Sequence, residues 1–139
     1  MNPGQPLRPL QKVASGGELS RIMLAIQTIL ATVDPTETII FDEIDSGIGG
    51  RIAEILGQKL SYLSKSHQVL CISHLPQIVA YANHHFQVSK HVAHGETYSK
   101  VGRLDPSGRI EELARMIGGT EITTKTRKLA AEMLQRCAR

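Results

Sequence analysis

Residues 15–33 carry apolar side chains at the spacing of a helix. The repeating positions are Ile22, Ile26, Ile29, Leu30 and Val33. The three residues that follow Ile22 are apolar as well, so we expect a helix that is buried on most sides. Ser15 with Glu18 three residues later predicts a capping box at its start, and Asp34-Pro35 predicts its end.

Two short continuous apolar runs, 38–41 and 68–72, are typical of parallel strands that are covered on both faces. A glycine-containing loop at 47–50 and a helix over 51–63 separate them. A further short helix is expected over 76–82, because proline is allowed in a first helical turn. Strands that alternate with helices predict an α/β fold with ligands at the carboxyl ends of the strands.

The rest of the chain predicts a β-hairpin followed by two helices. The expected segments are strands 85–91 and 97–104 and helices 109–117 and 121–135. The strands alternate apolar and polar residues on either side of a turn at 93–96. Gly118-Gly119 separates the two helices, and Thr120 is the expected N-cap of the second.

The composition is that of an ordinary globular domain, with 41% apolar and 21% charged residues in 139. Two Phe, three Tyr and no Trp are too few aromatic side chains for a base-stacking platform. Cys71, expected to be buried, and Cys137, expected to be exposed, imply no disulfide framework. Without an apolar run of membrane-spanning length or a charged-then-apolar leader, we expect a cytoplasmic protein with no membrane partner.

The formal net charge is +3, and the excess is densest in the last helix. Its charged residues are Lys125, Arg127, Lys128, Arg136 and Arg139, against Glu132. This pattern is compatible with binding to phosphate backbones. A solvated helix face whose last-turn cations suit the helix dipole is the favoured interpretation.

The opening segment, Met1 to Pro9, holds three of the six prolines and is not expected to form regular structure. It has the character of an interior loop that has been cut open.

Ser15-Gly16-Gly17 opens the first helix. Glycines there let phosphate oxygens approach the first-turn N–H groups, where the helix dipole favours an anion. Plain N-capping, with the glycines needed only for the turn, is the alternative.

Asp42 and Glu43 follow the first strand, and an extended backbone would point their side chains to opposite faces. One carboxylate can then hold hydrated magnesium while the other polarises an attacking water. Solvation of a loop, or capping of the next helix, is an equally open interpretation of these two acids.

His74 follows the second strand, where an imidazole can contact a terminal phosphate or orient a water. A histidine in a loop can also have no function. The other histidines are His67, His84, His85, His91 and His94. They lack the spacing of a zinc motif, so a metal site built from protein ligands is not expected.

In order and interval, these motifs resemble the C-terminal lobe of an ABC-type ATPase head. Ser15–Arg21 resembles the signature motif, and Thr38–Asp42 with Glu43 resembles Walker B and the catalytic glutamate. Asp45–Gly49 is similar to the D-loop, and Ser73-His74 to the switch histidine. Ile44-Asp45 after the glutamate is most similar to the SMC-related ATPases of bacterial DNA repair.

The resemblance implies a fold of mostly parallel buried strands flanked by helices, with a β-hairpin and two C-terminal helices. Residues 1–139 would then be an incomplete head, because they contain no Gly-x-x-x-x-Gly-Lys-[Ser/Thr] loop (Walker A), Q-loop or coiled coil. ATP and Mg²⁺ would be bound only together with an N-terminal lobe, and the isolated chain is expected to be inactive.

The resemblance also implies roles in a pair of heads that sandwich two ATP molecules. The residues that would contact the nucleotide or line the dimer seam are Ser15, Gly16, Gly17, Glu18, Asp45 and Ser46. Asp42 would hold magnesium through water, and Glu43 with His74 would act on the hydrolytic water.

The partners that the resemblance implies are the N-terminal lobe, a second identical head, and DNA. The complete protein would associate with the nucleoid and act in double-strand break repair. Two alternatives stay open. The chain is either a non-enzymatic module that docks on a complementary head or on DNA, or a truncated product without an autonomous role.

Overall fold

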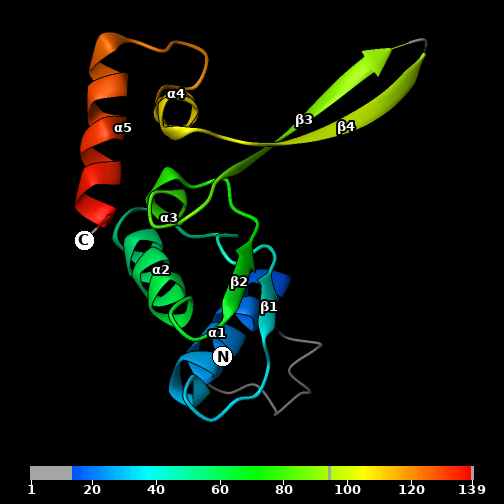
Figure 1. Ribbon diagram of the computed structural model, residues 1–139, viewed down its shortest axis with the longest axis vertical. Coiled ribbons are helices and arrows are strands. Elements are labelled where there is room, and N and C mark those ends of the chain that lie inside the picture. Colours follow the sequence, from blue (N-terminus) through cyan, green and yellow to red (C-terminus); the bar gives the residue numbers. More distant parts are fainter. Residues whose placement is uncertain (1–13, 94, 139) are drawn as a thin grey trace, which may run out of the picture.

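Helices and strands alternate along the chain as the sequence predicts. The computed structural model describes residues 14–93 and 95–138, so the opening segment at 1–9 lies outside the described residues (Figure 1). In chain order the elements are α1 (Gly16–Leu30), β1 (Thr38–Phe41), α2 (Gly50–Leu63), β2 (Gln68–Cys71), α3 (Pro76–Val79), β3 (Phe86–Ala93), β4 (Glu96–Arg103), α4 (Pro106–Gly118) and α5 (Thr124–Cys137).

The strands β1 and β2 pair in parallel, with Thr38 opposite Gln68 and Phe41 opposite Cys71. This register places the two strand ends, and therefore the residues that follow them, at the same edge of the sheet. One face of the pair packs against α1 and α2, and the largest side chains of this first core are Leu24, Phe41, Ile44 and Leu63.

The opposite face of this sheet is not covered by the described residues. Ile40 is 66% exposed, Leu70 47% and Ile72 63%. Apolar cover on both faces was expected, and the structure provides it on one face only. The continuous apolar runs therefore match a sheet whose second layer is not part of the described chain.

The helix α1 shows the same mismatch. Among its residues only Gly17, Leu24 and Gln27 are buried, whereas Ile29 is 80% exposed. The prediction of burial on most sides is wrong for this chain. The helix ends at Leu30, and the turn that follows is closed by the N–H groups of Val33 and Asp34, which both donate to the Leu30 carbonyl.

The strands β3 and β4 form the predicted antiparallel hairpin, which extends away from the helices (Figure 1). Its turn residue His94 lies outside the described residues. One face of the ribbon exposes three valines, Val88 at 65%, Val92 at 75% and Val101 at 63%, with Lys90 and Ser99 between them.

A hydrogen-bonded network anchors the base of the hairpin to α4. The Gln87 side-chain amide donates to the Glu112 carboxylate at 2.6 Å, and Arg115 donates to the same carboxylate from one turn along α4. Glu112 is only 9% exposed. Contacts from Arg115 lower its pKa despite burial, which raises it, and Gln87 adds to the lowering.

The last two helices begin at other residues than the sequence predicted. Asp105 caps α4 by accepting from the N–H of Gly108 at 2.6 Å, so the helix begins at Pro106 rather than Arg109. Thr120 was expected to cap α5, and this is wrong. Thr123 caps it instead, because its side chain and that of Thr126 exchange hydrogen bonds with each other's N–H groups.

A second core joins α3, α4 and α5 around Ala80, Leu113, Ala114 and Ala130. The short α3 also packs against α2 at Gly57, where a methyl group would overlap the Tyr81 ring and lie 3.0 Å from the Gln77 carbonyl oxygen. None of the helices in the described parts of the chain has the length and apolarity needed to span a bilayer.

The close approach at Gly57 predicts that Gly57→Ala destabilises the fold, although alanine is the better helix former. We expect a loss of about 1–3 kcal/mol in the free energy of unfolding, which is typical of overpacking. Urea denaturation followed by circular dichroism measures it. Lys59→Ala, on the exposed side of the same helix, is the matched control; an equal or higher stability of Gly57→Ala would contradict the α2–α3 packing.

Candidate functional site

The loop that follows β1 is held by side chains of α1. The Ser20 hydroxyl donates to the Asp42 carbonyl at 2.7 Å. The Arg21 guanidinium donates through Nη1 to the carbonyls of Ile44 at 3.1 Å and Ser46 at 3.0 Å. Three alternate carbonyls of the loop 42–46 therefore point toward one helix, and this fixes the backbone of the segment.

The glycines at the start of α1 let the helix approach this loop. A Cβ atom on Gly17 would lie 2.7 Å from the Glu43 carbonyl oxygen and 2.8 Å from the Ser46 Cβ. A Cβ on Gly16 would lie 2.7 Å from Glu43 Oε2. Packing against the loop backbone therefore requires glycine at position 17, whereas the Glu43 carboxylate beside Gly16 ends a flexible side chain that can move. The helix N-terminus lies beside this carboxylate.

Ser15 and Glu18 form the predicted capping box. The Ser15 N–H donates to Glu18 Oε2 at 2.8 Å, and the Glu18 N–H donates to the Ser15 hydroxyl at 3.3 Å. The Ser15 backbone and hydroxyl lower the pKa of Glu18, so the carboxylate stays charged at the positive end of the helix. The Ser15 hydroxyl and the Glu18 carboxylate thus both take part in the cap.

Asp42 and Glu43 are both exposed, and their backbone differs from the extended form that the sequence suggested. The strand ends at Phe41, and Glu43 has φ +54°, in the left-handed region. The Asp42 carboxylate accepts the Glu43 N–H at 2.8 Å. The alternation of a strand therefore does not reach Glu43. Glutamate in this conformation costs about 1–2 kcal/mol, a strain found mainly where function requires it.

Asp45 is the buried acid of the loop, 4% exposed. Its Oδ2 accepts the Ser73 hydroxyl at 2.7 Å, the His74 N–H at 2.8 Å and lies 2.9 Å from His74 Nδ1. Burial raises the pKa of this carboxyl, but the hydrogen bonds from Ser73 and His74 outweigh it and leave the pKa below its ordinary value. Asp45 is consequently an anion that binds the turn after β2.

The structure thus brings the sequence-predicted residues together around the loop 42–46. The N-terminus of α1 and the turn that carries His74 contact this loop, and the exposed acids Asp42 and Glu43 belong to it. Asp45 differs from the expectation that it lines a dimer seam, since its carboxylate is directed into the lobe. Ser46 is exposed, as a residue of a seam would be.

Sequence reasoning gave no separate role to Ser20 and Arg21. They lie four residues after Gly16 and Gly17, and therefore one turn along the same faces of α1. If the glycines are taken to contact the loop, this spacing indicates that Ser20 and Arg21 contact it too.

Asp42 offers an exposed carboxylate of the kind that binds a hydrated magnesium ion. Within the described ranges, no three His, Cys, Asp or Glu side chains are grouped as metal ligands. Magnesium usually keeps several waters and binds one or two carboxylates together with substrate phosphates. The exposed Asp42 fits that type of ligand set.

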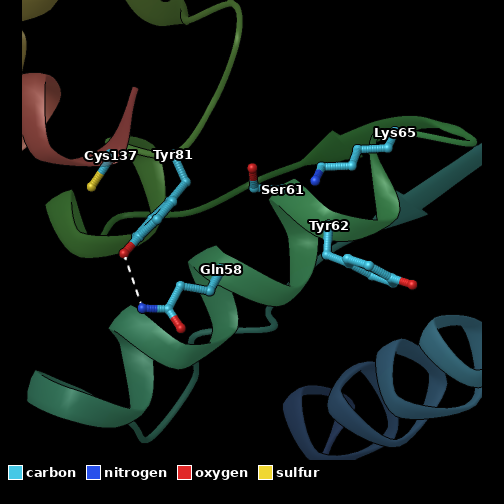
Figure 2. Close-up of a pocket in the computed structure, with 6 residues that line it drawn as sticks. All are labelled: Gln58, Ser61, Tyr62, Lys65, Tyr81 and Cys137. Atoms are coloured by element: carbon cyan, nitrogen blue, oxygen red, sulfur yellow. Dashed lines mark hydrogen bonds between the residues drawn. The ribbon is translucent and has the colours of Figure 1, made fainter. Parts of the chain in front are cut away.

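The hollow shown in Figure 2 lies elsewhere, between α2 and the end of α5. It measures about 210 Å³, and its lining residues are Gln58, Ser61, Tyr62, Lys65, Tyr81 and Cys137. None of the motif residues contributes to it.

The basic residues of α5 are partly neutralised. Arg127 pairs with Glu111 at 2.7 Å, and Arg136 lies 3.5 Å from Glu54. This agrees with a solvated helix face more closely than with a patch directed at nucleic acid.

Comparison with curated proteins gives a consistent result. The chain is 52% identical over 134 residues to the DNA repair protein RecN of Xylella fastidiosa, which covers 96% of the chain and 24% of that protein. RecN of Vibrio cholerae is 50% identical over 133 residues, and RecN of Bacillus subtilis 45% over 134. The chain spans about a quarter of the length of the curated relatives it matches. No protein-family model matches it.

Among solved structures, the chain is similar to one described under ATP-driven dimerization and DNA-stimulated activation of SMC ATPases. The TM-score is 0.56 with 21% identity, and the match covers 85% of this chain and 70% of that chain. The likeness shows the fold, and it agrees with the predicted α/β arrangement of strands and helices.

The left-handed conformation of Glu43 predicts an effect on stability. Asparagine tolerates this region better than glutamate or glutamine. We expect Glu43→Asn to be more stable than Glu43→Gln by about 0.5–1 kcal/mol, since both lack the charge and differ in backbone preference. Thermal unfolding of the two variants measures it, and equal stabilities would argue against a strained residue at this position.

Cys71 predicts a pH dependence of thiol reactivity. Cys71 and Cys137 are both half-buried, whereas the sequence predicted one buried and one exposed. Partial burial raises the pKa of the Cys71 thiol to about 12, and the nearby carboxylates of Asp45 and Asp42 add to the effect. Because the neutral thiol is unreactive, we expect a Cys137→Ser chain to resist iodoacetamide up to about pH 9 when folded and to react in urea. Mass spectrometry follows the alkylation; rapid labelling of the folded chain at pH 8 would contradict this burial.

Proposed function

Because this chain is homologous to bacterial RecN proteins over nearly all of its own length, we propose that it forms the C-terminal lobe of their ATPase head. The lobe would act in DNA double-strand break repair, where ATP binding and hydrolysis close and open a pair of heads on DNA. The observation that supports this most is the single loop 42–46, which contacts the signature glycines, carries both candidate catalytic acids and anchors His74.

In this proposal each residue has a task that its position allows. Asp42 is exposed at the strand end and holds a water-coordinated magnesium ion, which neutralises phosphate charge when it is bound. Glu43 is the general base for the attacking water. His74 contacts the terminal phosphate or orients that water.

The start of α1 serves the opposite head. Its first-turn N–H groups and its dipole suit the terminal phosphate of ATP bound by the other head. In the isolated lobe the Ser15 hydroxyl donates to Glu18 at 3.2 Å. To contact phosphate, the Ser15 hydroxyl proton would have to turn away from Glu18, while the Ser15 N–H would continue to donate to Glu18.

The exposed apolar surface indicates the complementary N-terminal lobe as partner. Ile40, Leu70 and Ile72 form an apolar strip on the sheet, and α1 exposes a further apolar side. Contiguous apolar surface of this kind marks an interaction site. A lobe that supplies the second layer would cover this strip and also supply Walker A, for which these 139 residues have no sequence.

The non-enzymatic alternative, a module that binds DNA through α5, has less support because Arg127 and Arg136 lie in ion pairs. We place the protein in the cytoplasm at the nucleoid, where its DNA partner is.

Nucleotide binding and hydrolysis test the proposal. The isolated chain should bind Mg-ATP weakly, because it lacks a phosphate cradle, and hydrolysis should appear after reconstitution with the co-expressed N-terminal lobe. Glu43→Gln should lower hydrolysis by roughly 100-fold or more, the usual contribution of a general base. Tight magnesium-dependent binding by the isolated chain, or unchanged hydrolysis by Glu43→Gln, would overturn the assignment.

The same assay contains a test of the apolar strip. Ile40→Glu should prevent reconstitution, whereas Leu129→Glu, an equally drastic change at a 45% exposed position of α5, should not. Hydrolysis by the Ile40→Glu mixture at the level of the unaltered chain would place the partner lobe elsewhere.

A further inference from the structure

The contacts of Asp45 converge on one of its two carboxylate oxygens. Oδ2 accepts from the Ser73 hydroxyl and the His74 N–H, and it lies 2.9 Å from the His74 ring nitrogen Nδ1. Two donors and a nearby ring nitrogen at a single oxygen are a typical arrangement for a charged carboxylate and an unfavourable one for a neutral group.

The two partners differ sharply in exposure. The Asp45 side chain is 5% exposed, whereas the His74 side chain is 74% exposed. The carboxylate is therefore fixed inside the lobe, and the imidazole extends from it to the surface. Within the described ranges, the opposite ring nitrogen Nε2 has no hydrogen-bond partner and is directed away from the acid.

The acid itself is held from the other side. The carbonyls of Ile44 and Ser46, which flank Asp45, both accept from Arg21 of α1. Its backbone is thus fixed by the helix while its side chain fixes the turn after β2. An anion held this firmly can impose an orientation on an exposed ring that would otherwise rotate.

From this geometry we propose that Asp45 is a positioning residue that keeps His74 in one tautomer. The proton of the neutral imidazole resides on Nδ1, which donates it to Asp45 in a hydrogen bond, and Nε2 presents its lone pair to the reacting water. The inference rests on the proposed role of His74 in ATP hydrolysis. It assigns Asp45 no contact with the nucleotide.

The tautomer is measured directly by ¹⁵N NMR of the histidine rings at pH 8.5, in the 139-residue chain alone or reconstituted with its N-terminal lobe. His74→Gln identifies the signals. We expect the Nδ1–H form for His74 in the unaltered chain and its loss in Asp45→Asn. An Nε2–H ring in the unaltered chain overturns the proposal without need of any variant.

Hydrolysis by the complete protein gives the second measurement. Asp45→Asn should lower kcat for ATP roughly tenfold to a hundredfold, as loss of a group that orients a functional histidine does, and leave KM nearly unchanged. Asp34→Asn, at a half-buried position in the turn before β1 and away from the site, is the matched control and should change neither measurement. An equal change of KM and kcat in Asp45→Asn overturns the positioning role.

Ser73→Ala separates orientation from folding. It removes one donor from Oδ2 and keeps the charge and the Nδ1 contact, so the Nδ1–H tautomer should persist even if stability falls. Its loss in Ser73→Ala overturns the proposal. Normal hydrolysis by His74→Gln, combined with an Asp45-dependent tautomer, supports the orienting contact and overturns only the role given to His74 in the proposed function.

Discussion

The loop 42–46 is the constraint on which the arrangement of the site depends. Its carbonyls are bound by Ser20 and Arg21 of α1, and its one buried carboxylate binds the turn that carries His74. Backbone groups of such a loop need partners because unpaired polar groups are costly where water is excluded. The lobe meets this need with side chains from the very segments that would handle a nucleotide. The hydrogen bonds that hold the loop in place therefore also position the residues that are candidates for catalysis.

The second general property of the lobe is its one-sided core. Phe41 and Ile44 are almost completely buried, while Ile40, on the other face of the same strand, is two-thirds exposed. Burial of apolar area is the main stabilising contribution to folding, so a sheet with one open apolar face is only partly stabilised by its own chain. In the proposed head, a complementary lobe would cover this face and add the stabilisation that the chain does not supply itself.

Much of this could be predicted from the sequence. The strand ends, the capping box at Ser15 and Glu18 and the order of the elements followed from periodicity and local chemistry. The positive φ of Glu43 and the inward direction of Asp45 did not, because both depend on how α1 packs against the loop. The N-cap of α5 was predicted at Thr120 instead of Thr123, because nearby threonines are nearly equivalent as caps until the Thr126 contact is known. The open apolar face of the sheet agrees with the incomplete head that the motifs imply, but the apolar runs alone did not show which face would lack cover.

The hairpin has a mechanical consequence. Its strands are eight residues long, so the ribbon extends about 26 Å from its base at the rise of a β-strand. Its described side-chain attachment to α4 is the Gln87 contact with Glu112. A rotation of α4 by about 10° would move the far end by about 4–5 Å over that length. The ribbon can thus act as a lever that converts small helix rotations into large displacements at its tip.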